Sequence, residues 1–146
     1  MKTMIFILFF ALTTISANAQ KINASEVPAA VTAAMAKSYP AVKKIKWEKE
    51  DANYEAEFEL NEIETSVVFD SQGNIKETET EIAVSALPKT VTDYIKTNYK
   101  NYKINEGAKI VDANGMIMYE AEVKKGKEKF DLLFDKEGTF IRKNAQ

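Results

Sequence analysis

The sequence predicts an α+β fold: two tandem α-β-β-β(β) repeats form one antiparallel sheet with both helices on one face. In each half of the chain, the spacing of the apolar residues changes from about four to two, as it does where a helix gives way to strands. Three short patterns also occur twice, sixty or sixty-five positions apart: Val27-Pro28 and Leu87-Pro88, residues 54–57 and 119–122, and residues 69–73 and 134–138.

Each repeat begins with a predicted helix. Pro28 and Pro88 suit a first helical turn, where the missing N–H would be unbonded anyway. Pro40 predicts the end of the first helix, because the residue before a proline avoids helical angles, and the second is expected to end near residues 98–101. One apolar stripe per helix is indicated by residues four apart: Val27, Val31, Met35 and Tyr39, then Leu87, Val91, Ile95 and Tyr99.

A meander of strands is expected after each helix, because apolar and polar residues alternate there as on strands with one buried face. Asn114-Gly115 is a strong hairpin signal. The expected strands cover residues 42–49, 54–60 and 63–69 in the first repeat, and residues 103–111, 117–123 and 130–134 with Phe140 in the second.

The first 19 residues are expected to be a secretory signal peptide, outside the fold. Residues 5–12 form an apolar run too short to span a membrane, and Ala17 and Ala19 fit a cleavage site. Cleavage after Ala19 leaves 127 of the 146 residues as a single domain (20–146), with repeats at about residues 23–82 and 83–146. The alternative is a retained membrane anchor. We expect a periplasmic or secreted protein.

Composition argues against several classes of function. The chain has no cysteine and no histidine, which removes the commonest general base, the commonest metal ligand and the thiolate nucleophile. Its formal net charge is −2, and loss of Lys2 with the leader makes it −3. That balance argues against nucleic acid as a partner, and no basic amphipathic stretch favours a membrane surface. We expect no enzyme activity, no cofactor and no metal.

The aromatic-rich sheet face is expected beneath the helices, and the opposite face is expected to be open. Mostly charged residues with an apolar centre are predicted there: Glu55, Glu57, Glu59, Ser66, Glu120, Glu122 and Asp131, with Val68, Leu133, Met116 and Met118 among them.

The glutamates on residues 55–59 form the most conspicuous carboxylate row. Residues two apart on a strand lie about 7 Å from each other. A calcium site needs six to eight converging oxygens, whereas a straight row diverges, and an acid/base pair needs a cleft. A solvated face is therefore the preferred interpretation of Glu55, Glu57 and Glu59.

Five apolar residues are the candidates for binding a partner: Val68, Leu133, Met116, Met118 and Trp47. Met116 and Met118 lie in a segment that interrupts the repeat, and flexible methionines suit adaptable binding surfaces, although filling a gap against a neighbouring strand is an equal alternative. Trp47 is either an interface anchor or part of the core, and strand parity with Ile45 favours burial.

The repeated motifs resemble those of the PepSY-like proteins of Bacteroidetes-type bacteria. The resemblance rests on the Val/Leu-Pro-x-x-Val helix start, the Tyr-Glu-Ala-Glu strand and the Phe-Asp-x-x-Gly turn, and it runs from about Val27 to Ile141. It implies a fold similar to that of the β-lactamase-inhibitory protein and a role in binding or restraining another exported protein, such as a hydrolase. None of its motifs is catalytic, and no inhibitory contact residue is matched.

These observations favour an exported, non-enzymatic binding module that binds or inhibits another periplasmic protein or peptidase through the open sheet face. The expected partner is an exported protein or peptide, not nucleic acid, and not a membrane after cleavage. The alternative is a small-ligand carrier with a pocket between helices and sheet. A hydrolase that uses carboxylates alone is a third interpretation.

Overall fold

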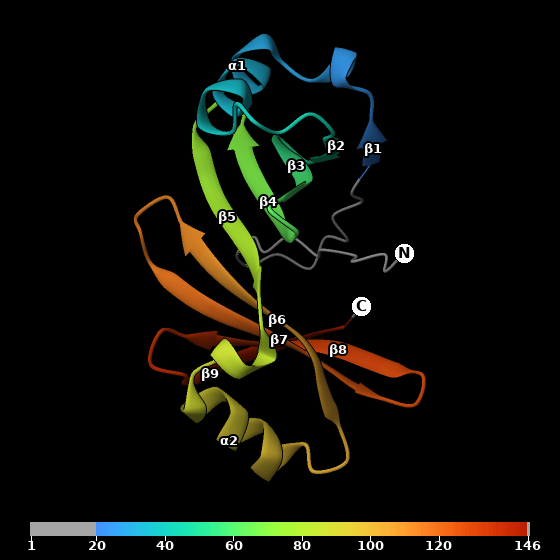
Figure 1. Cartoon of the computed structure of the whole chain (residues 1–146), viewed down its shortest axis with the longest axis vertical. Coiled ribbons are helices and arrows are strands. Elements are labelled where there is room, and N and C mark those ends of the chain that lie inside the picture. The colour runs from blue at the N-terminus through green and yellow to red at the C-terminus, as the bar shows by residue number, and fades with distance from the viewer. Residues whose placement is uncertain (1–19, 146) are drawn as a thin grey trace. The chain divides into compact units, whose positions relative to one another are not determined.

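The computed structural model describes residues 20–145, so the predicted signal peptide lies outside the described residues. Within this range, the strands follow chain order through an open sheet, β1 to β9, which confirms the predicted α+β fold (Figure 1). The elements are β1 (Gln20–Ile22), η1 (Ala24–Glu26), α1 (Ala29–Ser38), β2 (Lys46–Glu50), β3 (Asn53–Leu60), β4 (Ile63–Asp70), β5 (Ile75–Ile82), η2 (Val84–Ala86), α2 (Lys89–Asn98), β6 (Lys103–Asp112), β7 (Ile117–Lys125), β8 (Glu128–Asp135) and β9 (Phe140–Ala145).

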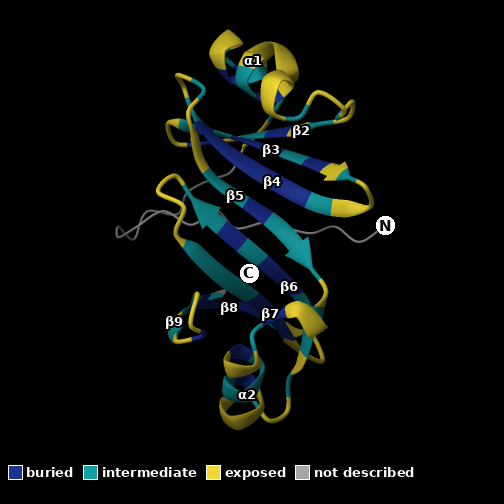
Figure 2. Cartoon of the chain, turned by 60° about the vertical axis from the view of Figure 1, so that its left-hand side comes forward, coloured by how far each residue is buried: buried dark blue, intermediate teal, exposed yellow. Residues whose placement is uncertain are grey.

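The chain divides within β5 into two compact units, unit 1 (Met1–Thr78) and unit 2 (Glu79–Gln146). Each unit has its own helix and its own core. Figure 2 shows that β4 is buried along most of its length, whereas both helices expose their outward sides. The exposure of the helices follows from the period of the sequence, because a helix with one apolar stripe buries only that stripe against its strands.

The core of unit 1 lies between α1 and one face of β2, β3 and β4. Antiparallel pairing places Trp47 opposite Ala56 and Tyr54 opposite Phe69. The helix contributes the two fully buried side chains of its predicted stripe. The buried residues of this core are Val27, Val31, Met35, Trp47, Ala56, Phe58, Val67 and Phe69.

Unit 2 repeats the arrangement with more aromatic contacts. Tyr94 on α2 stacks on Phe140, with ring centroids 5.0 Å apart, and meets Phe134 edge-on at 5.5 Å. The buried residues of this core are Leu87, Val91, Ile95, Ala121, Val123, Phe130, Leu132 and Phe134. Each helix therefore covers the tyrosine- and phenylalanine-bearing face of its own unit, as predicted.

Some element boundaries differ from the prediction. Pro28 caps α1 instead of lying in its first turn, and its carbonyl accepts hydrogen bonds from the N–H groups of Val31 and Thr32 at 3.0 and 3.1 Å. The strand expected at residues 42–49 begins only at Lys46. Strand β5 was not among the predicted strands, because its threonines and glutamates give no apolar alternation.

The repeated Phe-Asp-x-x-Gly motif forms a tight turn in both units. The Asp135 carboxylate accepts hydrogen bonds from the N–H groups of Glu137 and Thr139 at 3.0 and 2.8 Å. Asp70 does the same for Gln72 and Asn74, both at 3.0 Å. In these turns an aspartate side chain replaces a backbone partner.

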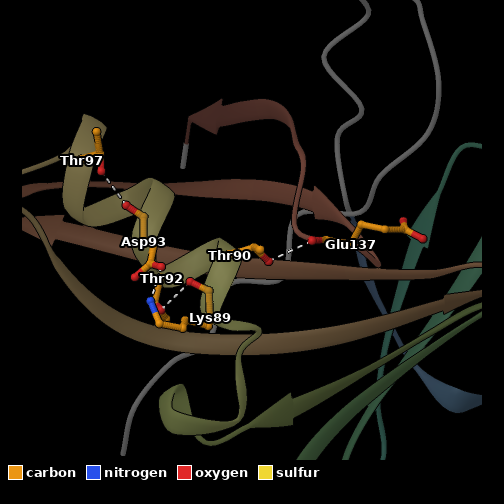
Figure 3. A network of polar contacts seen from close by, with 6 residues as sticks. All are labelled: Lys89, Thr90, Thr92, Asp93, Thr97 and Glu137. Atoms are coloured by element: carbon orange, nitrogen blue, oxygen red, sulfur yellow. Dashed lines mark hydrogen bonds and ion pairs between the residues drawn. The ribbon is translucent and has the colours of Figure 1, made fainter.

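The glycine of this turn lies directly against the first turn of the helix. Gly138 has φ +84, and a Cβ there would lie 1.9 Å from Thr90 Oγ1 and 3.2 Å from the Val91 nitrogen. Figure 3 shows Thr90 reaching this turn, where its hydroxyl donates to the Glu137 carbonyl at 2.9 Å. The other polar contacts drawn there, including the Lys89–Asp93 ion pair, stay within the exposed side of α2. The turn therefore fixes the start of α2 against the sheet.

Replacing Gly138 by alanine should destabilise the protein more than replacing Gly115. Both residues have positive φ, but a Cβ on Gly115 meets nothing within 4 Å. We expect Gly115→Ala to cost about 1–2 kcal/mol through backbone conformation alone, and Gly138→Ala to cost about 3 kcal/mol or more because crowding is added. Urea unfolding measures both, and equal losses would contradict the close turn–helix contact.

Replacing the buried central phenylalanine of either unit by alanine should destabilise the protein strongly. Phe69 and Phe134 have no exposed surface, so each change to alanine is expected to lower the free energy of unfolding by about 3–5 kcal/mol. The exposed Ile63, changed to alanine, is the control and should stay within about 0.5 kcal/mol. Chemical denaturation showing losses below about 1 kcal/mol for both phenylalanines would contradict these cores.

Candidate functional site

A carboxylate cluster, defined here as Glu48, Glu50, Glu55 and Glu57, lies on the face of unit 1 opposite α1. A two-residue turn joins β2 to β3, so Glu50 pairs with Asn53 and Glu48 pairs with Glu55. Side chains two apart on a strand point to the same face. One carboxylate oxygen from each of Glu48, Glu55 and Glu57 lies within 4.8 Å of the other two. The carboxylates converge because they come from two paired strands. Three carboxylates in a row along a single strand would lie too far apart to do so.

Glu55 is the most deeply buried member of the cluster. Only 2% of its surface is exposed. The Ser66 hydroxyl on β4 donates a hydrogen bond to its carboxylate, but its Oε2 atom is buried and has no hydrogen-bond partner. A buried carboxylate oxygen without a partner is costly to the fold.

Burial and crowding make these carboxylates hard to ionise. The pKa of Glu55 is raised to about 8, mainly by burial and additionally by the charges of Glu57, Glu50 and Glu48, whereas the hydrogen bond from Ser66 lowers it. The pKa of Glu50 is raised to about 7, again mainly by burial, with the charges of Glu48 and Asp51 as smaller causes. These are the two ways in which a site disfavours a negative charge.

Glu57 has the only ion pair recorded for this cluster among the described residues. Its Oε2 atom lies 3.9 Å from the Nζ atom of Lys46, a side chain that is 78% exposed. Burial and Glu48 raise the pKa of Glu57, whereas the charges of Lys46 and Lys21 lower it. A highly exposed lysine at this distance neutralises the cluster weakly.

The expected solvated row is wrong for Glu55. Along β3, Glu55 is buried, Glu57 is half-buried and Glu59 is exposed. Glu48 and Glu50 were not part of the predicted row, because they come from the neighbouring strand β2. The signal that could have found them is the short turn at residues 51–52, which fixes the register of the hairpin.

The equivalent place in unit 2 is built differently. Glu122 forms an ion pair with Lys129 and accepts a hydrogen bond from the Asn105 amide at 2.6 Å. Glu120, which corresponds to Glu55 in the repeat, lies opposite Ala108, where unit 1 has Glu48. The carboxylate triad is therefore a feature of unit 1 and not of the repeat.

The predicted open face is wrong at its centre. Val68 and Leu133 lie on the expected face but are 3% and 0% exposed. Each belongs to a central strand beside a longer side chain in register, Glu55 for Val68 and Arg142 for Leu133, and such stems cover apolar surface. Ser66, Glu122 and Asp131 are buried on the same face.

The other three candidate residues have different environments. Trp47 is buried in the core of unit 1, with its ring centroid 6.4 Å from that of Phe69, as strand parity predicted. Met118 is half-buried opposite Ile110 on β6. Met116 precedes β7 and is 58% exposed. The binding role of the five residues stays a prediction, and Met116 is the most accessible of them.

A firmly held turn presents Met116. The Asp112 carboxylate accepts hydrogen bonds from the N–H groups of Asn114 and Met116, both at 2.8 Å. These bonds lower the pKa of Asp112. The turn joins the longest strands of the described residues, β6 and β7, so the Met116 side chain stands at the end of an ordered hairpin.

An open groove runs beside α2 in unit 2. The rings of Tyr94 and Phe140, which line it, contact each other and the Phe134 ring. A carrier would need a deeper, mostly enclosed pocket. The groove is lined by Thr90, Asp93, Tyr94, Thr97, Asn98, Gly138, Thr139 and Phe140.

Comparison with known proteins gives a family and several solved folds. A family model described as "Putative beta-lactamase-inhibitor-like, PepSY-like" matches residues 13–77 and 54–142. A BLIP-like protein of Bacteroides fragilis is 29% identical, with 81% of this chain and 86% of that chain covered and a TM-score of 0.64. Among proteins with curated descriptions, none matches.

Two further solved structures share the fold at lower identity. One of the "putative periplasmic proteins" of Bacteroides eggerthii is 21% identical, with 82% and 88% of the two chains covered and a TM-score of 0.74. A DUF2874 family protein of Bacteroides uniformis is 24% identical, with 81% and 88% covered and a TM-score of 0.71. None of the helices in residues 20–145 has the length and apolarity needed to cross a membrane.

In the presence of a chelator, the protein should lose stability as the pH rises from about 5 to about 8. Over this range Glu55 ionises in the unfolded chain but keeps its proton in the folded one, because its pKa is raised from 4.5 to about 8. The unfolded state then binds fewer protons, so the free energy of unfolding falls by up to about 1.4 kcal/mol per pH unit for this group.

The neutral variant Glu55→Gln should make this profile less steep, with the remaining slope due to Glu50 and Glu57, whose pKa values are also raised. Glu59→Gln, an exposed position on the same strand, should keep the wild-type slope. Urea unfolding at a series of pH values gives the measurement. A wild-type profile that is flat between these limits would show that Glu55 is ionised in the fold.

Proposed function

The chain belongs to this PepSY-like, beta-lactamase-inhibitor-like family, and on that premise we propose that it is a periplasmic protein-binding module with no catalytic activity of its own. The observation that carries the proposal is the β6–β7 hairpin, which presents Met116 at an ordered tip. The partner is another exported protein, and the family description favours an enzyme that the module restrains.

The hairpin has the properties expected of a contact element. Met116 is apolar, flexible and 58% exposed, which suits a shallow apolar pocket on a partner. The Asp112 hydrogen bonds order the turn in advance, so binding need not order it again. Val68 and Leu133 are buried and are therefore left out of the proposed contact.

The location of the protein also supports a periplasmic partner. The predicted leader at residues 1–19 and the periplasmic description of the Bacteroides eggerthii structure both favour export. Cleavage after Ala19 would release the module from the membrane. The released module would then be in the same compartment as other periplasmic proteins.

A binding role also fits the chemistry of the sequence better than catalysis. The chain has no histidine and no cysteine, so a nucleophile would lack its usual base. A small-ligand carrier has weaker support, because the groove beside α2 is open and not enclosed.

The tip of the hairpin can be tested by site-specific photo-crosslinking. A photoreactive residue at position 116 should form an adduct with a periplasmic protein, and the same probe at Ile63, an exposed isoleucine beside the β3–β4 turn, should not. Against the captured partner, Met116→Asp should lower affinity by about 2 kcal/mol, or about thirtyfold, as for a central interface residue. Ile63→Asp should leave affinity unchanged.

Equal adducts at the two positions, or equal affinity of the two aspartate variants, would remove the hairpin from the proposal. Failure of both probes to capture any exported protein would count against the binding role itself.

A further inference from the structure

We propose that Glu48, Glu55 and Glu57 form a binding site for one divalent cation of the size of Ca²⁺, on the face of unit 1 opposite α1. This goes beyond protein binding and differs from the expectation, drawn from the sequence, that the chain has no metal site. The three residues come from two paired strands, so the site is built on the sheet and not on a loop.

The first observation is the spacing of the oxygens. One oxygen from each of the three carboxylates lies within 4.8 Å of the other two. Ligands bound to one Ca²⁺ at about 2.3–2.6 Å are separated by at most about 5 Å. The same three oxygens could therefore contact a single ion with little movement of their strands.

The second observation is independent of the first. Glu55 is 98% buried, and its Oε2 atom has no hydrogen-bond partner. Ser66 donates to the same carboxylate, which holds the side chain among the cluster and leaves that oxygen available. A bound cation would give this oxygen the partner that the protein does not provide.

Charge favours the same conclusion. Among the described residues, the three carboxylates face only weak counter-charges: the mostly exposed Lys46, at 3.9 Å from Glu57, and Lys21, whose charge also acts on Glu57. Glu50, two residues after Glu48 on β2 and on the same face, adds a fourth carboxylate. A divalent cation would relieve the repulsion that these groups exert on each other.

The size of the ion follows from coordination chemistry. Mg²⁺ needs ligands at about 2.0–2.1 Å in strict octahedral geometry, which is tighter than the present spacing. Ca²⁺ accepts six to eight oxygens in flexible geometry. Three carboxylates supply three to six of them, and water reaching the half-exposed Glu48 and Glu57 supplies the rest. Ca²⁺ is therefore the preferred ion.

The second repeat gives a matched comparison inside the same chain. Its equivalent of Glu57, Glu122, is paired with Lys129 and bonded to Asn105, and Ala108 occupies the position that corresponds to Glu48. In unit 2, the carboxylate of Glu122 thus has protein partners. In unit 1, the Oε2 atom of Glu55 has no hydrogen-bond partner.

The experiment uses the mature chain, freed of metal with a chelator, and titrates it with CaCl₂ by calorimetry at constant ionic strength. We expect saturable binding of one ion per chain, with an affinity in the range of extracellular calcium modules, about 0.1–1 mM. Thermal unfolding should shift upwards with added CaCl₂, and MgCl₂ at the same ionic strength should bind at least about tenfold more weakly.

Three variants locate the site. Glu55→Gln and Glu48→Gln should each weaken Ca²⁺ binding by about tenfold or more, because ligand charge sets affinity. Glu59→Gln and Glu122→Gln remove the same charge outside the triad and should bind as the wild type does. Circular dichroism shows whether each variant folds. Because Glu48 is half-exposed, Glu48→Gln should fold even if Glu55→Gln does not, and it then tests the site alone.

Absence of saturable Ca²⁺ binding in the wild type would overturn the proposal. So would equal responses to CaCl₂ and MgCl₂, which indicate screening of surface charge only, or unchanged binding in both triad variants. None of these results bears on Met116, so a negative outcome here leaves the proposed partner binding standing.

Discussion

The register of the β2–β3 hairpin is the constraint on which unit 1 depends. The two-residue turn at residues 51–52 places Trp47 beside Ala56 on the helix side, and it thereby places Glu48 beside Glu55 on the other. Alternation along a strand links these two outcomes. With α1 packed over the aromatic face, this register brings the glutamates together on the other face, and burial there raises the pKa of Glu55 and Glu50.

Local patterns predicted the fold well, because they act over a few residues. Apolar residues four apart located both helices, and the Asp-x-x-Gly turns occur where the repeat placed them. Strand β5 escaped detection because glutamates occupy one of its faces and threonines the other, so no apolar residue alternates with a polar one in its middle. Trp47 was assigned to the core by parity alone, since its neighbours on the strand fix the side on which it lies.

The candidate site could be predicted only in part, because burial and convergence arise between strands. Val68 and Leu133 were placed on the correct face, but the sequence carries no signal that long neighbouring side chains cover them. Glu48 was missed since its partner lies seven residues away across a turn. Met116 was chosen because it interrupts the repeat and follows an Asn-Gly turn; it is exposed, and its binding role stays a prediction.

For the proposed contact at Met116, the order of the hairpin tip has a kinetic consequence. The Asp112 carboxylate accepts hydrogen bonds that order residues 112–116 without a partner, so little conformational entropy would remain to be lost on binding. Encounter would then resemble the docking of two rigid bodies, and altered contacts at the tip would change the residence time of the complex far more than its rate of formation.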